Sequence, residues 1–430
     1  SARLSSTRTV TSSANTSRTA AKALGAGVAA LVALHSCKVY DESLLEGSAA
    51  SSVPPEQWGS GVGWWSKQGG DGCVTAGVPT PGHRPKNTPA DSVPDLHFAI
   101  NSMALGSLDR NGDATDGAWK TLGFDLDGIC TNSETCSVEP KAMPCTPVGA
   151  APGDGRECRD NTFGRLESDA IALQGLGTDF GLSNDAFNCA LCRGDYNFVF
   201  RLSKWNGTPN DENVRLDFYP SPGLEKKPSW ACELKSNGAW KANPCWKPAD
   251  KWTIQKGTFD GSVTPAQLPS ALLNDPSAYV RDGYIVGQLP ENTNFWFPGK
   301  SAAWAYPLKL QRAIVVAKIV ESEGSYRMED GTIAGRARLT DLGQAFEDLG
   351  LCTGHPLYNL MKGQLALNAD VLYNGTNSES AACDALSVGI GFDARQASFG
   401  VEAPSVILPG CPSNLDGGTD GGDAGAKDGG

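Results

Sequence analysis

The stretch YNFVFRLSKWNGTPNDENVRLDF, residues 196–218, alternates apolar and polar side chains over two segments. A period of two is typical of strands that bury one face. Residues 206–211 (NGTPND) separate the two segments and supply the glycine, proline and asparagine typical of a turn. We therefore predict an antiparallel hairpin, whose buried face carries Tyr196, Phe198, Phe200, Leu202, Val214, Leu216 and Phe218.

Further strand candidates extend this pattern over residues 93–411, which we take as one folded body large enough for a substantial core. Long alternating strands joined by loops of Gly, Asn, Asp and Pro are typical of all-β folds. We predict a mainly β body, an antiparallel β-sandwich of jelly-roll type. The other expected strands are residues 96–105, 284–289, 308–320, 326–337 and 387–392.

Two short helices are expected near the C-terminal end of the body, over residues 341–349 and 357–366. Thr340 can cap the first helix, and Gly350 can end it. Pro356 suits the first position of the second helix. We interpret the pair as a short structural insert in the sandwich.

A signal for export precedes the body. Residues 1–22 carry four basic side chains and no acidic one, and the short apolar run ALGAGVAALVAL follows at 23–34. This order is typical of a signal peptide, and the run is too short for a permanent membrane helix. Leu34 and Ser36 before Cys37 resemble a bacterial lipobox, with His35 as a departure that leaves ordinary cleavage and a soluble secreted form as the alternative. We expect residues 1–36 to be a signal peptide and Cys37 to carry a lipid that anchors the chain to the outer membrane or cell surface.

The segments that flank the body are rich in small and polar residues. Residues 37–92 are rich in Ser, Gly and Pro and are expected to form a tether. Cys73 and the group Trp58, Trp64 and Trp65 indicate that the middle of this tether docks on the body. Residues 412–430 are rich in Gly and Asp and are expected to be a disordered tail.

The charge balance favours cations as partners. Removal of residues 1–36 takes away four of the 36 basic residues and none of the 48 acidic ones, so the formal net charge changes from −12 to −16. Such a surface repels nucleic acid. We therefore expect Ca²⁺ as a partner and no nucleic acid.

The cysteines predict a disulfide framework. If Cys37 carries a lipid, twelve of the thirteen cysteines remain, an even number that can pair completely. The rival uses are zinc binding and redox chemistry at Cys189-Ala-Leu-Cys192. A zinc ribbon needs two such pairs, and a thioredoxin-type site needs a strand before the motif and a helix after it. Neither requirement is met in the sequence.

Acidic loops are the candidate calcium site. Asp109, Asn111 and Asp113 place oxygen donors at alternate positions, as calcium loops do. The twelve-residue EF-hand pattern is excluded because its sixth and twelfth positions are Ala114 and Lys120. A looser calcium loop remains the prediction.

A second set of acids follows closely. Asp125 and Asp127 share one side of an extended segment, so they need a cation, a shared proton or open water. Asp160 and Asn161 can complete such a site if disulfides fold the region between Cys130 and Cys158 back on itself. The alternative is that these residues are solvated turn acids.

Four tryptophans form the candidate ligand-binding surface: Trp230, Trp240, Trp246 and Trp252. Exposed on a sandwich, they would stack on the faces of sugars. The alternative is that they pack a loop closed by Cys232 and Cys245.

No motif identifies catalytic residues. The chain lacks a nucleophile elbow, a His-Glu-x-x-His helix and a phosphate loop. A glycosidase needs two carboxylates about 5–10 Å apart on opposite sides of the bond it cleaves. Asp125 and Asp127, two residues apart on one strand, fit at best the short end of that range. His97 and His355 are isolated and are interpreted as structural or surface residues.

Residues 119–128, 159–164, 205–211 and 383–392 resemble uncharacterised secreted lipoproteins of myxobacterial type. The resemblance covers roughly residues 93–405 and implies an envelope location, but it implies no activity. We therefore predict an envelope-anchored binding or structural module that holds calcium and contacts polysaccharide or another envelope protein. The alternative is an extracellular carbohydrate-active enzyme on the same scaffold.

Overall fold

The computed structural model describes residues 63–68, 73–110, 112, 115, 117–131, 143–172, 184–227, 246–264, 268–297, 306–322, 324–408 and 410–411. The predicted signal peptide, Cys37 and the predicted tail lie outside these residues. Four predicted site residues also lie outside them: Asn111, Asp113, Trp230 and Trp240.

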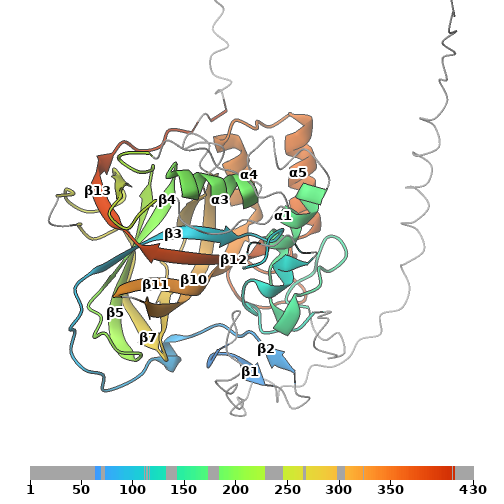
Figure 1. The fold of residues 1–430 in the computed structure, drawn as a ribbon. Coiled ribbons are helices and arrows are strands. Elements are labelled where there is room, and N and C mark those ends of the chain that lie inside the picture. The colour runs from blue at the N-terminus through green and yellow to red at the C-terminus, as the bar shows by residue number, and fades with distance from the viewer. Residues whose placement is uncertain are drawn as a thin grey trace, which may run out of the picture. The chain divides into compact units, whose positions relative to one another are not determined.

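Eight strands form a closed antiparallel barrel in which each strand pairs with the next barrel strand along the chain (Figure 1). The last strand pairs with the first, since β12 contacts β3 through pairs such as Phe392 with Met103. The strands are β3 (Leu96–Ala104), β4 (Asn197–Ser203), β5 (Asp211–Ser221), β7 (Leu273–Arg281), β8 (Tyr284–Gln288), β10 (Tyr306–Ser322), β11 (Ser325–Arg338) and β12 (Ala385–Gln396).

The predicted β-sandwich of jelly-roll type is therefore wrong, although the mainly β class is confirmed. In a sandwich the strands divide between two sheets, whereas here β10 pairs with both β8 and β11, and β3 pairs with both β12 and β4. Alternation in the sequence shows that a strand buries one face. It does not show whether the first and last strands meet.

The predicted hairpin is confirmed as β4 and β5. Phe200 pairs with Phe218 and Leu202 with Leu216 in an antiparallel register. The side chain of Asn206 organises the turn, because its Oδ1 accepts a hydrogen bond of 2.8 Å from the N–H of Thr208. The outer face of the hairpin is also buried, since Val199 and Tyr219 pack in a second cluster outside the barrel.

The barrel interior is packed with side chains. Its core residues include Phe98, Phe200, Leu216, Ile333 and Val388, each at most 1 % exposed. An eight-stranded barrel has an interior that side chains can fill completely. This barrel is therefore a solid scaffold that positions its loops.

The five other predicted strands and both predicted helices are confirmed with small changes at their ends. Helix α4 spans Leu339–Asp348 with Arg338 as its N-cap in place of the predicted Thr340, and α5 spans Pro356–Leu367. Figure 1 shows α4 beside α5 next to the barrel.

Several elements were not predicted. These are the helices α1 (Thr162–Ala172) and α3 (Asn184–Arg193) and the strands β1 (Lys67–Gln68), β2 (Val74–Thr75), β6 (Lys251–Gln255), β7, β9 (Thr293–Phe297) and β13 (Ser398–Ala403). β1 pairs with β2, β9 extends the barrel sheet beside β10, and β13 pairs in parallel with β6.

Disulfides crosslink the barrel and its loops. Every cysteine in the described part of the chain is disulfide-bonded, including Cys189 and Cys192. Three pairs are defined: Cys130–Cys158, Cys145–Cys383 and Cys352–Cys411. These bonds confirm the predicted disulfide framework and are consistent with an exported protein.

The middle of the predicted tether packs on the barrel, as Trp64 and Trp65 indicated. Both are buried, and the ring of Trp65 lies 5.0 Å from Tyr284 of β8 and 6.3 Å from Phe124. The indole N–H of Trp64 donates to the carbonyl of Arg281 at 3.1 Å. Among the described helices, none is both long enough and apolar enough to cross a membrane.

Candidate functional site

Three carboxylates converge in the loops that precede helix α1, next to the N-terminal segment, residues 63–68 and 73–80, which packs on the barrel. Asp125, Asp127 and Asp160 each present an oxygen, and these three oxygens lie within 4.8 Å of one another. Asp125 is 8 % exposed and Asp160 is 2 % exposed. The alternative that they are solvated turn acids is therefore excluded for these two residues.

Backbone pairing and one disulfide bring these acids together. The N–H of Asp160 donates to the carbonyl of Phe124 at 3.0 Å, and the N–H of Asp125 donates to the carbonyl of Ala76 at 2.8 Å. The Cys130–Cys158 disulfide closes the same loop. The condition set by the sequence, that a disulfide folds this region back on itself, is met.

Backbone N–H groups fix the orientation of each carboxylate. Oδ1 of Asp125 accepts from Gly128 at 2.7 Å, and Oδ1 of Asp127 accepts from Ile129 at 2.7 Å. Oδ2 of Asp160 accepts from Leu126 at 2.6 Å. The tight loop needs glycine at position 128, whose φ of 77° lies in the left-handed region. In the described residues these bonds engage one oxygen of each acid, so the second oxygen can coordinate a cation.

Two further acids surround this group and were missed by sequence reasoning. Asp154 and Asp370 interact electrostatically with Asp127 and Asp160. The backbone N–H of Thr131 donates to Asp154. Asp370 accepts from the hydroxyl of Thr162 at 2.8 Å and from the N–H of Ser387 at 2.8 Å. We call Asp125, Asp127, Asp154, Asp160 and Asp370 the acidic cluster.

Burial raises the pKa values throughout the acidic cluster, and repulsion between carboxylates raises those of Asp127, Asp154 and Asp160 further. Burial raises the pKa of Asp125 to about 6, and burial with the charges of Asp127 and Asp125 raises that of Asp154 to about 9. The pKa of Asp160 lies well above its usual range, through burial first and then through the neighbouring carboxylates. Without a cation, the folded protein holds protons that the unfolded chain releases at neutral pH.

This shift predicts how stability depends on pH when divalent cations are removed. A carboxyl whose folded pKa is raised stabilises the fold at low pH, and that stability is lost as the pH rises through the folded pKa. In EDTA, the melting temperature should fall progressively between pH 5 and 9, the window set by Asp125 and Asp154. Asp154→Asn should flatten the upper part of this decline. A melting temperature that rises from pH 6 to 9 in EDTA would contradict the assignment.

Positive charge near the acidic cluster is limited. Arg336 of β11 is 6 % exposed and donates to the carbonyl of Leu126 at 2.7 Å. Its charge lowers the pKa of Asp127, and the charge of Lys67 lowers that of Asp125. Neither effect outweighs burial, because both pKa values remain raised.

Asn161 was predicted as a ligand, and the structure gives it another role. Its Oδ1 accepts from the N–H of Gly164 at 3.0 Å in the first turn of α1, and from the N–H of Gly389 in β12 at 2.8 Å. Its Nδ2 donates to the carbonyl of Trp119 at 3.2 Å. The side-chain oxygen of Asn161 already accepts two backbone bonds and so holds the start of α1 against β12, while its role as a metal ligand stays a prediction.

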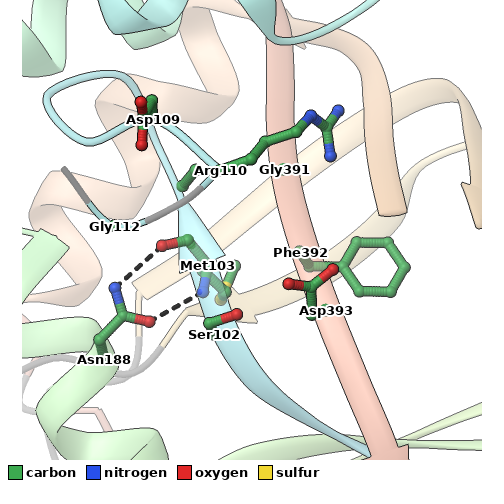
Figure 2. Close-up of a pocket in the computed structure, with 10 residues that line it drawn as sticks. Ser102, Met103, Asp109, Arg110, Gly112, Asn188, Gly391, Phe392 and Asp393 are labelled. Carbon is green, nitrogen blue, oxygen red and sulfur yellow. Dashed lines mark hydrogen bonds between the residues drawn. The ribbon is translucent and has the colours of Figure 1, made fainter. Parts of the chain in front are cut away.

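Asp109 lies in a different loop, which leaves β3 (Figure 2). It lines a cavity of about 20 Å³ with Arg110 and Asp393, room for about one water molecule. Asn188 of α3 borders the same cavity. Its Oδ1 accepts from the N–H of Met103 at 2.8 Å, and its Nδ2 donates to the carbonyl of Met103 at 2.9 Å. Asp109 therefore does not join the group formed by Asp125, Asp127 and Asp160.

The predicted tryptophan surface is wrong for the two members in the described residues. Trp246 and Trp252 are 2 % and 0 % exposed and pack edge to face with ring centres 5.4 Å apart. They fill the cluster between the barrel and the β6–β13 sheet. The packing alternative accounts for them, because buried rings cannot stack on a sugar.

The two isolated histidines, His97 and His355, lie in different parts of the fold. His355 is the N-cap of α5, where Nδ1 accepts from the N–H of Leu357 at 3.2 Å. His97 lies on β3 and its ring contacts Phe399 of β13 at 5.0 Å. The structural interpretation is confirmed for His355.

Comparisons of the chain with protein-family models, with curated proteins and with solved structures find no match. The candidate site must therefore be interpreted from its own geometry.

Proposed function

We propose that the chain is an exported, disulfide-crosslinked barrel module, anchored by a lipid on Cys37, in which Asp125, Asp127 and Asp160 bind one calcium ion. In this proposal it serves as a binding or structural component of the cell envelope. The observation that carries the calcium site is the convergence of three largely buried carboxylates whose oxygens lie within 4.8 Å of one another. Calcium prefers such oxygen ligands.

The charges support a divalent ion. The three carboxylates carry a formal charge of −3 and the guanidinium of Arg336 offsets one unit of it, so a divalent cation would relieve their mutual repulsion. Asp154 is not among the three acids whose oxygens converge, but its charge acts on Asp160. Asp370 is held by Thr162 and Ser387 and adds negative charge around the site.

A cation in this position would join separate parts of the chain. Asp125 and Asp127 belong to the loop paired with the N-terminal segment at Ala76, and Asp160 precedes α1. Ca²⁺ would therefore fix the N-terminal segment, which leads back toward Cys37, against the barrel. We propose that calcium stiffens the connection between the anchor and the body.

The export proposal has its own support. The disulfides are consistent with an oxidising compartment, and residues 1–37 have the pattern of a signal peptide with a lipobox. The resemblance to secreted lipoproteins of myxobacterial type points to the same location.

Calcium titration tests the site. With the disulfides intact, Ca²⁺ at about 100 times its Kd should raise the free energy of unfolding by about 2.7 kcal/mol, because it binds only the folded state. Isothermal titration calorimetry should give one site per chain, and melting in Ca²⁺ against EDTA should show the stabilisation. Absence of both heat and a melting shift would contradict the proposal.

The geometry does not favour the alternative of a carbohydrate-active enzyme. Glycosidases place their two carboxyl groups about 5–10 Å apart across a cleft. Neither the cavity at Asp109 nor the larger one beside His97 is lined by Asp125, Asp127 or Asp160. We therefore assign no catalytic residues.

A further inference from the structure

A second cavity lies outside the barrel, where β13 crosses the start of β3. It has a volume of about 280 Å³ and is lined by His97, Lys251 and Glu225 and by the residues 398–401 of β13. Small-molecule sites commonly occupy about 300–1,000 Å³, so this cavity suits a ligand the size of a single amino acid.

Unpartnered polar atoms gather in this part of the molecule. Nε2 of His97 is buried without a hydrogen-bond partner in the described residues, and so are the indole N–H groups of Trp246 and Trp252 nearby. Buried polar atoms are normally paired, so an unpartnered one beside a cavity is a candidate ligand contact. Burial lowers the pKa of His97 to about 4, so its ring is neutral at pH 7 and can donate or accept one bond.

Two opposite charges line the cavity without pairing with each other. Both residues, Lys251 and Glu225, are exposed at the rim of the cavity, and Lys251 takes part in no ion pair among the described residues. Glu225 is held in place because its Oε1 accepts from the N–H of Val401 at 2.6 Å. Gly400 makes this approach possible, since a Cβ there would lie 2.1 Å from the same Oε1. The second oxygen of Glu225 remains available to a cationic group.

The rest of the lining is apolar. Phe399 and Val263 belong to the edge of the cluster that contains Trp252, and Val401 is 60 % exposed. The lining thus offers a partner for a carboxylate, a partner for an ammonium group, and aromatic and aliphatic surface. The two kinds of surface match the two halves of an apolar α-amino acid.

We propose that this cavity binds a small zwitterion with an apolar side chain, of the class of hydrophobic α-amino acids. Its carboxylate contacts Lys251 and its ammonium group contacts Glu225. Its apolar side chain lies against Phe399, Val263 and Val401, and Nε2 of His97 completes the polar contacts.

Ligand-observed saturation-transfer NMR with L-leucine tests this site on the full chain with its disulfides intact. The leucine methyl groups should receive saturation from the protein. Leucine amide, which lacks the carboxylate, and 4-methylpentanoate, which lacks the ammonium group, should bind at least about tenfold more weakly. A neutral sugar such as glucose should not compete.

Variants locate the binding. Lys251→Met and Glu225→Gln should each weaken L-leucine binding at least about tenfold. The matched control is Lys226→Met, because Lys226 is exposed like Lys251 but does not line the cavity. Melting curves should show that all three variants fold. No saturation of leucine, equal binding of the two analogues, or binding that survives both cavity substitutions would overturn the proposal.

These outcomes are separate from those of the calcium site. Calcium binding should be unchanged by Lys251→Met, and leucine binding should be unchanged by Asp160→Asn. Failure of one proposal therefore leaves the other intact.

Discussion

Asp160→Asn is expected to remove the whole stabilisation by calcium, about 2.7 kcal/mol when Ca²⁺ is present at about 100 times the wild-type Kd. Asp160 is 2 % exposed and contributes one of the three converging oxygens. An amide oxygen carries no formal charge, so the site loses a third of the charge that three carboxylates supply. The amide oxygen can still accept the N–H of Leu126, which keeps the loop in place.

Without calcium the same substitution should not lower the melting temperature. In EDTA at pH 8, wild-type Asp160 is a buried acid whose pKa is raised by burial and by Asp127, Asp154 and Asp125. Replacing it with Asn removes this repulsion, so the variant should melt at the same temperature as wild type or higher. A purely structural role for Asp160 would give a lower melting temperature in both solutions.

Asp109→Asn is the matched control, because Asp109 lies in another acidic loop that the sequence also marked as a calcium site. Its melting shift between EDTA and Ca²⁺ should equal that of wild type. If Asp109→Asn removes the shift and Asp160→Asn keeps it, calcium binds at the Asp109 loop and our assignment is wrong.

Seven of the eight barrel strands could be predicted from the sequence because apolar residues recur along them with the spacing of a strand. Phe198, Phe200 and Leu202 share one face of β4 because successive side chains in a strand point to opposite sides. β7 was missed because LNDPSAYVR contains a proline and lacks this alternation in its first half. Closure of the barrel depends on contacts between β3 and β12, which are nearly 300 residues apart in the chain. No local pattern encodes that contact.

The candidate site was predictable in part for the same reason. Asp125 and Asp127 are neighbours in sequence, and Asp160 follows Cys158, so one disulfide suffices to bring them together. Asp370 lies after α5, and only the completed barrel carries it to Thr162. Asp154 lies in a loop rich in glycine and proline, where an isolated acid gives no signal. Sequence reasoning found the local members of the acidic cluster and missed the distant ones.

Burial of the tryptophans also depended on long-range pairing. β13 pairs in parallel with β6, with Phe399 opposite Trp252, and this small sheet covers the outer face of the hairpin. The hairpin therefore buries both faces, although its sequence predicts one. An aromatic segment looks the same in sequence whether it is exposed or covered by a distant strand.

Phe200→Ala is expected to lower the free energy of unfolding by about 3–5 kcal/mol, a large part of the total of about 5–15 kcal/mol for a typical protein. Phe200 lies on β4 and is 1 % exposed. Its ring meets Phe218 of the neighbouring strand β5 edge to face at 5.1 Å and stacks on Phe392 of β12 at 5.5 Å. Removing the ring leaves a cavity at the place where β4 faces the strand that closes the barrel.

Urea unfolding with the disulfides intact measures this loss as a lower midpoint at unchanged slope. Phe200→Leu keeps most of the volume and should lose less, which provides a folded variant if Phe200→Ala does not fold. Leu272→Ala is the control, because Leu272 is 54 % exposed and its truncation should change the free energy by less than about 0.5 kcal/mol. Equal losses for Phe200→Ala and Leu272→Ala would contradict a filled barrel. A large loss for Phe200→Ala alone is the result expected if β4, β5 and β12 enclose one interior, since the ring of Phe200 contacts both Phe218 and Phe392.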